Sequence, residues 1–103
     1  MNYISTMTEL IEQVENWAID KNIVTKDNWP KQLAKVVEEL GELSSAMLKE
    51  NSFLEIDSFG DVLVTLIVLA KQRDIKLQLA LEAAYNEIKN RTGKTVNGTF
   101  IKD

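Results

Sequence analysis

Two groups of carboxylates in this sequence have spacings that place each group on one face of a helix. Glu38, Glu39 and Glu42 form the first group, and Glu39 and Glu42 are near enough along a helix to share one ligand. Asp57 and Asp61, four residues apart, form the second. An all-oxygen cluster of this kind suits Mg²⁺ or Mn²⁺, and Mg²⁺ held by few carboxylates typically works with substrate phosphates. The chemistry indicated is hydrolysis of a phosphate ester or phosphoanhydride.

The surroundings of the two groups differ. On a helical wheel of about 100° per residue, the three glutamates lie opposite an apolar stripe, which is the ordinary arrangement of a solvated acidic face. Asp61 instead directly precedes the apolar run VLVTLIVLA, where an unpaired carboxylate is costly to desolvate. Because Asp57 and Asp61 also lie in the opening turns of their helix, where the helix dipole favours acids, a purely structural role for this pair stays open. The stripe opposite the glutamates consists of Leu33, Val36, Val37, Leu40, Leu43 and Met47.

The charge of the chain is concentrated around these carboxylates. The 103 residues include 12 basic and 16 acidic side chains, a net charge of −4, but residues 38–61 alone carry seven acids and one base. The chain has no histidine and no cysteine. This excludes Ser-His-Asp and Cys-His catalysis, disulfides and cysteine-ligated zinc. Catalysis would therefore depend on carboxylates, amines, hydroxyls or a bound metal.

A phosphate substrate requires cationic partners, and the C-terminal part of the chain contains candidates. Asn86, Lys89 and Arg91 cluster near the end of an expected helix, and Lys94 follows. An arginine can bind phosphate through two parallel hydrogen bonds. Basic residues at a helix C-terminus are also favoured by the helix dipole alone, so both explanations stay open.

Hydrophobic periodicity predicts an all-α fold, a four-helix bundle followed by a short irregular tail over about residues 92–103. We expect one domain spanning residues 1–103. The helices are expected at about residues 7–21, 28–50, 54–73 and 75–91.

Local signals define the ends of these helices. Thr6 and Glu9 form a capping box before the first helix, while Asn28 is the expected N-cap of the second, with Pro30 in its first turn. Asp74 is the expected N-cap of the fourth helix, and Gly93 supplies its stop. In the tail, Asn97-Gly98 is a turn signal, but the flanking β-formers are too short to predict a hairpin.

The third helix is apolar on all sides in its centre, which predicts burial all round. A four-helix chain of this size seldom encloses one helix completely. We therefore expect this helix to lie in a subunit interface, and the protein to be a homo-oligomer.

Other partners are disfavoured by the sequence. The N-terminus lacks a basic region followed by an apolar stretch, so we expect no secretory signal. The longest nearly apolar run has nine residues, too few to span a bilayer, so no membrane partner is expected. With a pI near 4.8 and no basic stripe, nucleic acid is not an expected partner either. We expect a soluble cytoplasmic protein.

The carboxylate motifs also resemble a known family. The segment KVVEELGELSSAM, followed by DSFGDVLVTLIVLA, resembles the MazG-like family of all-α nucleoside triphosphate pyrophosphohydrolases, in particular its small phage and prophage members. The family pattern is EExxE followed by ExxD. The segment 38–42 matches the first motif and Asp61 matches the aspartate of the second, but Ser58 stands where the second motif has glutamate. The segment AYNEIKNRTGKTVNG adds to the resemblance.

The resemblance implies that the protein hydrolyses (deoxy)nucleoside triphosphates to the monophosphate and pyrophosphate. It implies Mg²⁺ as cofactor, with Mn²⁺ as a substitute, and assembly into homodimers or homotetramers. Glu39, Glu42 and Asp61 would bind the metal, with Asp57 as a less secure fourth ligand. Glu38 would be a ligand, a neighbour of the ligands, or a group that orients water.

Further roles follow from the resemblance for residues that contact the substrate. Lys89 and Arg91, together with Asn86 and Lys94, would hold the polyphosphate. Lys35 would contact phosphate or form an i, i+4 ion pair with Glu39. Trp29 or Tyr85 would stack on the base or belong to the core.

Two alternatives remain at the level of sequence. Phosphoribosyl-ATP pyrophosphohydrolase is a related activity on the same fold. A non-catalytic helical oligomerisation module with a degenerate metal site is the other alternative, and Ser58 is the feature that favours it.

Overall fold

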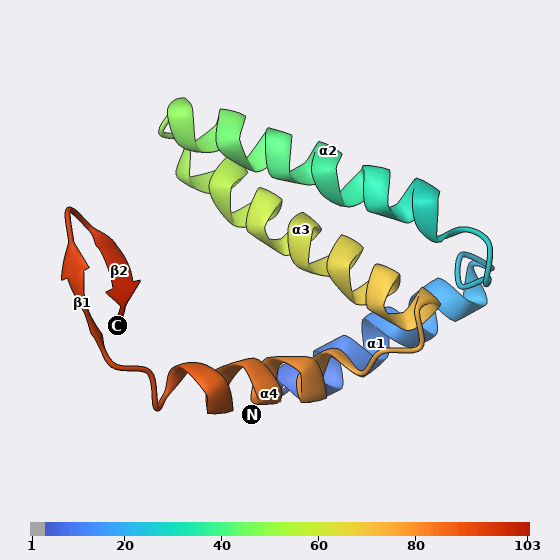
Figure 1. Ribbon diagram of the computed structural model, residues 1–103. Coiled ribbons are helices and arrows are strands. Elements are labelled where there is room, and N and C mark those ends of the chain that lie inside the picture. Colours follow the sequence, from blue (N-terminus) through green and yellow to red (C-terminus); the bar gives the residue numbers. More distant parts are fainter. Residues whose placement is uncertain (1–3) are drawn as a thin grey trace.

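The computed structural model describes residues 4–103 and contains four helices followed by a two-stranded hairpin (Figure 1). The first three residues, part of the segment inspected for a secretory signal, lie outside the described residues. Within residues 4–103, no helix is long and apolar enough to cross a membrane. The elements are α1 (Met7–Asp20), α2 (Trp29–Leu48), α3 (Ser52–Gln72), α4 (Leu77–Ile88), β1 (Gly93–Val96) and β2 (Thr99–Lys102).

The predicted start of α1 is confirmed in full, whereas that of α2 is confirmed only in part. The predicted capping box is present: the Thr6 hydroxyl accepts from the Glu9 backbone N–H at 3.1 Å, and the Glu9 carboxylate accepts from the Thr6 N–H at 3.2 Å. Pro30 lies in the first turn of α2, as predicted. Asn28 occupies the N-cap position, but its side chain makes no capping bond and donates to the Ile23 carbonyl at 3.4 Å instead.

The beginning of α4 differs from the prediction. Asp74 is not its N-cap; it adopts a left-handed conformation, with φ of 56°, in the turn that ends α3. The N-cap is Lys76, and the helix ends at Ile88, three residues before the predicted end at Arg91. Asp and Asn tolerate the left-handed region better than most residues, so Asp74 suits this turn rather than the N-cap position.

The centre of the fold is the antiparallel pair α2 and α3, which share the most extensive helix–helix contact (Figure 1). Two side-chain hydrogen bonds stabilise this arrangement. The Gln32 amide of α2 donates to the Thr65 carbonyl of α3 at 3.1 Å, and the Gln72 amide of α3 donates to the Ile23 carbonyl in the loop between α1 and α2 at 3.0 Å. Buried residues recur along both helices at heptad spacing. The resulting seam contains Gln32, Val36, Glu39, Leu43 and Ala46 on α2, and Ser58, Val62, Thr65, Leu69 and Gln72 on α3.

The α2–α3 seam corrects the sequence interpretation of α2. The apolar stripe was expected to be the packing face, with the glutamates opposite it, but Glu39 lies on the seam. Much of the stripe lies beside the seam and is exposed: Val37 is 63% and Leu40 48% exposed. We call this side of the helix pair the apolar flank; it comprises Leu33, Val37, Leu40 and Met47 of α2, and Ile56, Phe59, Leu63 and Leu66 of α3. The opposite side, the acidic flank, carries Glu38, Glu42, Asp57 and Asp61.

Helix α1 packs across α3, whereas α4 adds little to the core. Ile11 and Ala18 of α1 are buried, as are Ile67 and Val68 of α3. Helix α4 has no buried residue. It leads away from the helix pair towards the C-terminal hairpin (Figure 1).

The C-terminal tail is a β-hairpin rather than the predicted irregular segment. Strands β1 and β2 pair antiparallel, with Val96 opposite Thr99 and Gly93 opposite Lys102. Asn97 and Gly98 both have positive φ, 50° and 80°, which is the conformation that a tight two-residue hairpin turn requires. At Gly93 a side chain would collide with Phe100, since a Cβ there would lie 2.8 Å from the ring.

The single chain is much more open than a closed bundle. Its radius of gyration is 16.4 Å, against about 13 Å for a compact domain of this length. Its accessible surface is 8340 Å², against about 5,900 Å² for a folded monomer of this mass. In α3, Leu63 and Leu66 remain exposed. The burial all round that the sequence predicts for α3 is therefore not supplied within one chain.

Candidate active site

The three glutamates of α2 form a compact carboxylate group. Glu38, Glu39 and Glu42 each offer an oxygen, and these oxygens lie within 4.8 Å of one another. The EExxE spacing brings this about, because residues three or four apart on a helix are neighbours. Such a group can hold a divalent cation, which would offset part of its negative charge.

Glu39 is the most perturbed member of this group. Its half-buried position on the α2–α3 seam raises its pKa above the usual 4.5 by desolvation, and the nearby charges of Glu42, Asp61 and Glu38 raise it further. A hydrogen bond with the Glu42 carboxyl acts in the same direction. The Glu39 Oε2 atom is shielded from solvent and has no hydrogen-bond partner among residues 4–103. A shielded carboxylate oxygen without a donor fits a cation ligand.

The two aspartates of α3 are placed differently from each other. Asp61 lies near enough to Glu39 for its charge to raise the Glu39 pKa, so α3 brings a fourth carboxylate to the group. Asp57 is exposed one turn earlier and does not contribute to that pKa rise. Both residues are on the acidic flank, and Asp61 is the one whose charge raises the pKa of Glu39.

Ser58, at the position of the missing motif glutamate, is buried against α2. It lines a hollow of about 190 Å³ together with Glu42. The serine therefore stands beside the carboxylate group, and the hollow provides space next to it. The other residues around this hollow are Ser45, Ala46, Lys49 and Leu54.

One predicted cation lies beside the carboxylates, with a different partner from the one expected. The Lys35 ammonium is 4.0 Å from the Glu38 carboxylate, an i, i+3 pair, rather than paired with Glu39 at i, i+4. Both side chains are more than half exposed, so the pair adds little to stability. The pair places one positive charge beside the carboxylate group.

The cations of the C-terminal part are not brought to the carboxylates within one chain. Arg91 forms an ion pair with Glu87 at 3.0 Å on its own segment. Asn86 and Lys89 lie at the exposed end of α4, and Lys94 lies on β1. Figure 1 shows this end of α4 and the hairpin projecting away from α2 and α3.

The two aromatic candidates for base stacking are also separate from the carboxylate group. The Trp29 ring lies under the Arg73 guanidinium, with 5.0 Å between the guanidinium carbon and the ring centroid. Trp29 precedes Glu39 by ten residues, a rise of about 15 Å along α2. Tyr85 is on α4 and is 58% exposed.

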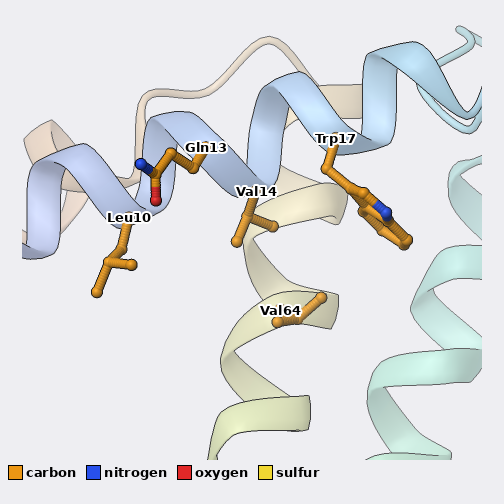
Figure 2. Close-up of a pocket in the computed structure, with 5 residues that line it drawn as sticks. All are labelled: Leu10, Gln13, Val14, Trp17 and Val64. Atoms are coloured by element: carbon orange, nitrogen blue, oxygen red, sulfur yellow. The ribbon is translucent and has the colours of Figure 1, made fainter. Parts of the chain in front are cut away.

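An apolar hollow beside the acidic flank was missed by sequence reasoning. It has a volume of about 340 Å³ and lies where α1 crosses α3 (Figure 2). Val64, one turn beyond Asp61, forms its α3 side, and Trp17, about half exposed, forms one end. The sequence interpretation placed Trp17 on the core stripe of the first helix. Because residues four apart share a helix face, the polar Gln13 indicates that Trp17 lies at the edge of that stripe rather than in its centre. The remaining lining residues are Leu10, Gln13 and Val14.

Comparison with known proteins fits this arrangement of helices and carboxylates. A sequence profile described as phosphoribosyl-ATP pyrophosphohydrolase matches residues 2–92, most of the chain. The chain belongs to the phosphoribosyl-ATP pyrophosphohydrolase family. This confirms the resemblance to the MazG-like all-α pyrophosphohydrolases that the two acidic motifs indicated. The description of this family is that of a pyrophosphohydrolase, and the Glu38, Glu39 and Glu42 group could hold a divalent metal.

A phage protein is among the relatives of this family member. The chain is 39% identical over 72 residues to an uncharacterized 18.2 kDa protein in the rep-hol intergenic region of Haemophilus phage HP1 (strain HP1c1). The alignment covers 70% of this chain and 44% of the phage protein, so the chain spans less than half the length of that relative. No solved structure matches the chain.

Proposed function

We propose that this protein is a Mg²⁺-dependent nucleotide pyrophosphohydrolase that converts (deoxy)nucleoside triphosphates to monophosphates and pyrophosphate. The observation that carries the proposal is the Glu38–Glu39–Glu42 group, in which a shielded Glu39 oxygen lacks a donor and Asp61 adds a fourth charge. A divalent cation would offset much of the charge of this group, and an all-oxygen ligand set favours Mg²⁺ or Mn²⁺.

The ligands in this proposal are Glu39, Glu42 and Asp61, with Asp57 available as a further ligand from the preceding turn. A bound Mg²⁺ supplies Lewis-acid polarisation of phosphate oxygens and lowers the pKa of a coordinated water. Ser58 in place of a motif glutamate leaves the ligand set with one carboxylate fewer, which predicts weaker metal affinity rather than loss of the site.

The reaction itself is hydrolysis of the phosphoanhydride between the α- and β-phosphates. The water oxygen forms a bond to the α-phosphorus, the bond from that phosphorus to the bridging oxygen breaks, and pyrophosphate leaves with the electron pair. Glu38 is suited to orient the water and accept its proton, because it is exposed and adjoins the ligands. The Lys35 ammonium places one positive charge beside the Glu38 carboxylate.

The apolar hollow on the same side of the molecule suits the remainder of the substrate. With Trp17 at one end and Val64 one turn from Asp61, it offers an apolar surface to a base next to the carboxylate group (Figure 2). Base-stacking on an aromatic ring is available to every nucleobase. We therefore assign base contact to Trp17 in preference to Trp29 or Tyr85.

The protein acts as a homo-oligomer in this proposal. The chain exposes about 2,400 Å² more surface than a folded monomer of its mass would. Permanent interfaces bury about 2,000–5,000 Å² in total, shared between two partners, so this excess is of the right size for one. The apolar flank, where Leu40 and Leu63 are each almost half exposed, is the proposed contact surface.

Phosphoribosyl-ATP is a second candidate substrate, and the family match favours it. Its hydrolysis breaks the same type of bond and also releases pyrophosphate, so the carboxylate site serves either substrate equally. The difference lies in the group attached to the base, which the hollow near Trp17 would have to accommodate.

A direct assay tests the proposal. The full chain is incubated with Mg²⁺ and a panel of ribo- and deoxyribonucleoside triphosphates and phosphoribosyl-ATP, and pyrophosphate release is followed. We expect release with at least one substrate, loss of at least about a hundredfold in kcat/KM for Glu39→Gln, and an unchanged rate for Ser52→Ala at the exposed start of α3. No release with any substrate would establish instead a non-catalytic helical module.

A further inference from the structure

The C-terminal hairpin is a defined structure without a partner in its own chain. All eight strand residues are exposed, and within residues 4–103 neither strand makes extensive contact with a helix. Val96 and Ile101 share one face of the hairpin with Lys94, and both are about half exposed. Since an isolated two-stranded hairpin is at best marginally stable in water, this element requires a surface to pack against.

The charge of the hairpin segment indicates what kind of surface this is. Residues 89–103 contain four bases and one acid, Asp103, a net charge of +3, whereas residues 38–61 carry a net charge of −6. The bases are Lys89, Arg91, Lys94 and Lys102, distributed over the end of α4 and both strands. The most basic segment of the molecule and its most acidic segment are therefore complementary, yet they are separate in one chain (Figure 1).

The carboxylate site has little positive charge of its own. Lys35 is paired with Glu38 and is more than half exposed, and Lys49, which follows α2, lines the hollow beside Glu42. One divalent cation offsets two of the four carboxylates, and a triphosphate then adds further negative charge. Phosphate binding at this site is therefore favoured by cations beyond Lys35 and Lys49.

We propose that the C-terminal hairpin of one chain docks on the acidic flank of a second copy, where Arg91 and Lys94 face the carboxylate site. The substrate pocket is then composite, with metal ligands from one chain and phosphate-binding cations from the other. This inference rests on the proposed function for the role of the cations, but the docking itself does not depend on turnover. The unusually large exposed surface of the chain, 8340 Å², leaves room for this contact beside the apolar flank.

Site-specific cross-linking tests the docking, and because the chain has no native cysteine, every disulfide formed involves an introduced thiol. Thr99→Cys places a thiol on the hairpin. Ser45→Cys places one on the acidic side of α2, in the hollow shared with Glu42, and Ser44→Cys is its matched control, four residues after Leu40 on the apolar flank. Single-substitution chains are mixed in pairs, oxidised and separated without reductant, so any mixed disulfide joins two chains.

We expect the Thr99→Cys chain to form a mixed disulfide with Ser45→Cys in at least tenfold preference to Ser44→Cys. Equal cross-linking to both serine positions, or none to Ser45→Cys, would overturn the proposal. A chain carrying both Thr99→Cys and Ser45→Cys provides a further check. Formation of its disulfide only within the chain would show docking in cis and would equally overturn it.

A second measurement examines the charge complementarity. Because the docking joins opposite charges, raising the salt concentration from 0.05 M to 1 M should reduce the Thr99–Ser45 cross-link, since screening shortens the range of exposed charge interactions. Lys94→Glu in the Thr99→Cys chain should reduce it at low salt as well. Cross-linking that is indifferent to both changes would contradict a charge-directed contact. None of these readouts requires a substrate, so failure of the docking is distinguishable from absence of pyrophosphohydrolase activity.

Discussion

The two flanks of the α2–α3 pair are built on the same helices but have opposite chemistry. On one side Glu38, Glu42 and Asp61 gather charge next to the half-buried Glu39. On the other side Leu40 and Leu63 belong to a broad apolar surface. The difference shows how one packing seam positions two unlike surfaces: the seam sets the carboxylate geometry on one side and leaves an apolar surface exposed on the other.

The largest effect should come from separating the two aspartates of the acidic flank. Asp61→Asn should lower kcat/KM at least about a hundredfold, because Asp61 is electrostatically linked to Glu39, whereas Asp57→Asn should lower it less than about tenfold. Steady-state kinetics at saturating Mg²⁺ measures both. Equal losses of kcat/KM in the two variants would mean that Asp57 is as important as Asp61, and that the effect of Asp61 on the Glu39 pKa does not distinguish the metal ligands.

The apolar flank is tested by a charge placed in its centre. Leu40→Asp should raise the dissociation constant of the oligomer at least about a hundredfold, since burying an unpaired carboxylate costs several kcal/mol. Leu79→Asp is the control, because Leu79 is 60% exposed on α4, outside the flank. Sedimentation velocity gives both constants. An oligomer that tolerates Leu40→Asp as well as Leu79→Asp would place the interface elsewhere.

Metal binding should stabilise the acidic flank and leave the apolar flank unaffected. At a Mg²⁺ concentration of a hundred dissociation constants, mass action adds about 2.7 kcal/mol to the free energy of unfolding, a rise in Tm on the order of 10 °C. Thermal melts monitored by circular dichroism measure this. Glu42→Gln should reduce the rise, while Ser44→Ala should retain it; a rise that is the same in both variants would indicate non-specific binding.

A smaller effect is expected from completing the second acidic motif. Ser58→Glu places a carboxylate beside Glu42, where a hollow of about 190 Å³ offers room for it. We expect the Mg²⁺ concentration for half-maximal activity to fall about tenfold. The metal-free variant should melt at a lower temperature than the parent, because it carries one more like charge. An unchanged Mg²⁺ requirement would show that position 58 does not face the metal.

The smallest effect concerns the pH dependence of the metal-free protein. The pKa of Glu39 is raised above the usual 4.5 in the folded state, so the folded chain binds more protons than the unfolded chain between these two values. The free energy of unfolding contributed by this group therefore decreases as the pH rises through that window. Urea denaturation in EDTA should show this decrease for the parent and a flatter profile for Glu39→Gln. An identical profile would contradict the raised pKa.

Much of the helical fold was predictable because its signals are local. The capping box of Thr6 and Glu9 and the first-turn Pro30 were read correctly from adjacent residues. The seam was not, because Gln32 and Glu39 are polar residues on a packing face, and their burial depends on partners far away in the sequence. Periodicity weights apolar side chains, so it placed the packing face on the wider apolar stripe.

The site was predictable in its motif but not in its surroundings. EExxE spacing alone brings Glu38, Glu39 and Glu42 together, and the structure confirms that group. The placement of Lys89 and Arg91 depended on how α4 leaves α3, which no local pattern encodes. The hairpin was missed for a related reason: its strands are short, and its order comes from the turn at Asn97 and the fit of Phe100 over Gly93.

The openness of the single chain has a consequence for how the protein forms. Helices α2 and α3 are joined by a short turn, so their contacts are local in sequence and are expected to form early in folding. Helix α4, with no buried residue, gains little until chains meet. Under the proposed function and docking, the metal ligands would be assembled in the first folding unit, while the cations of the C-terminal segment would be positioned only by association. Activity would then depend on protein concentration, and dilution would abolish it without unfolding the ligand-bearing helices.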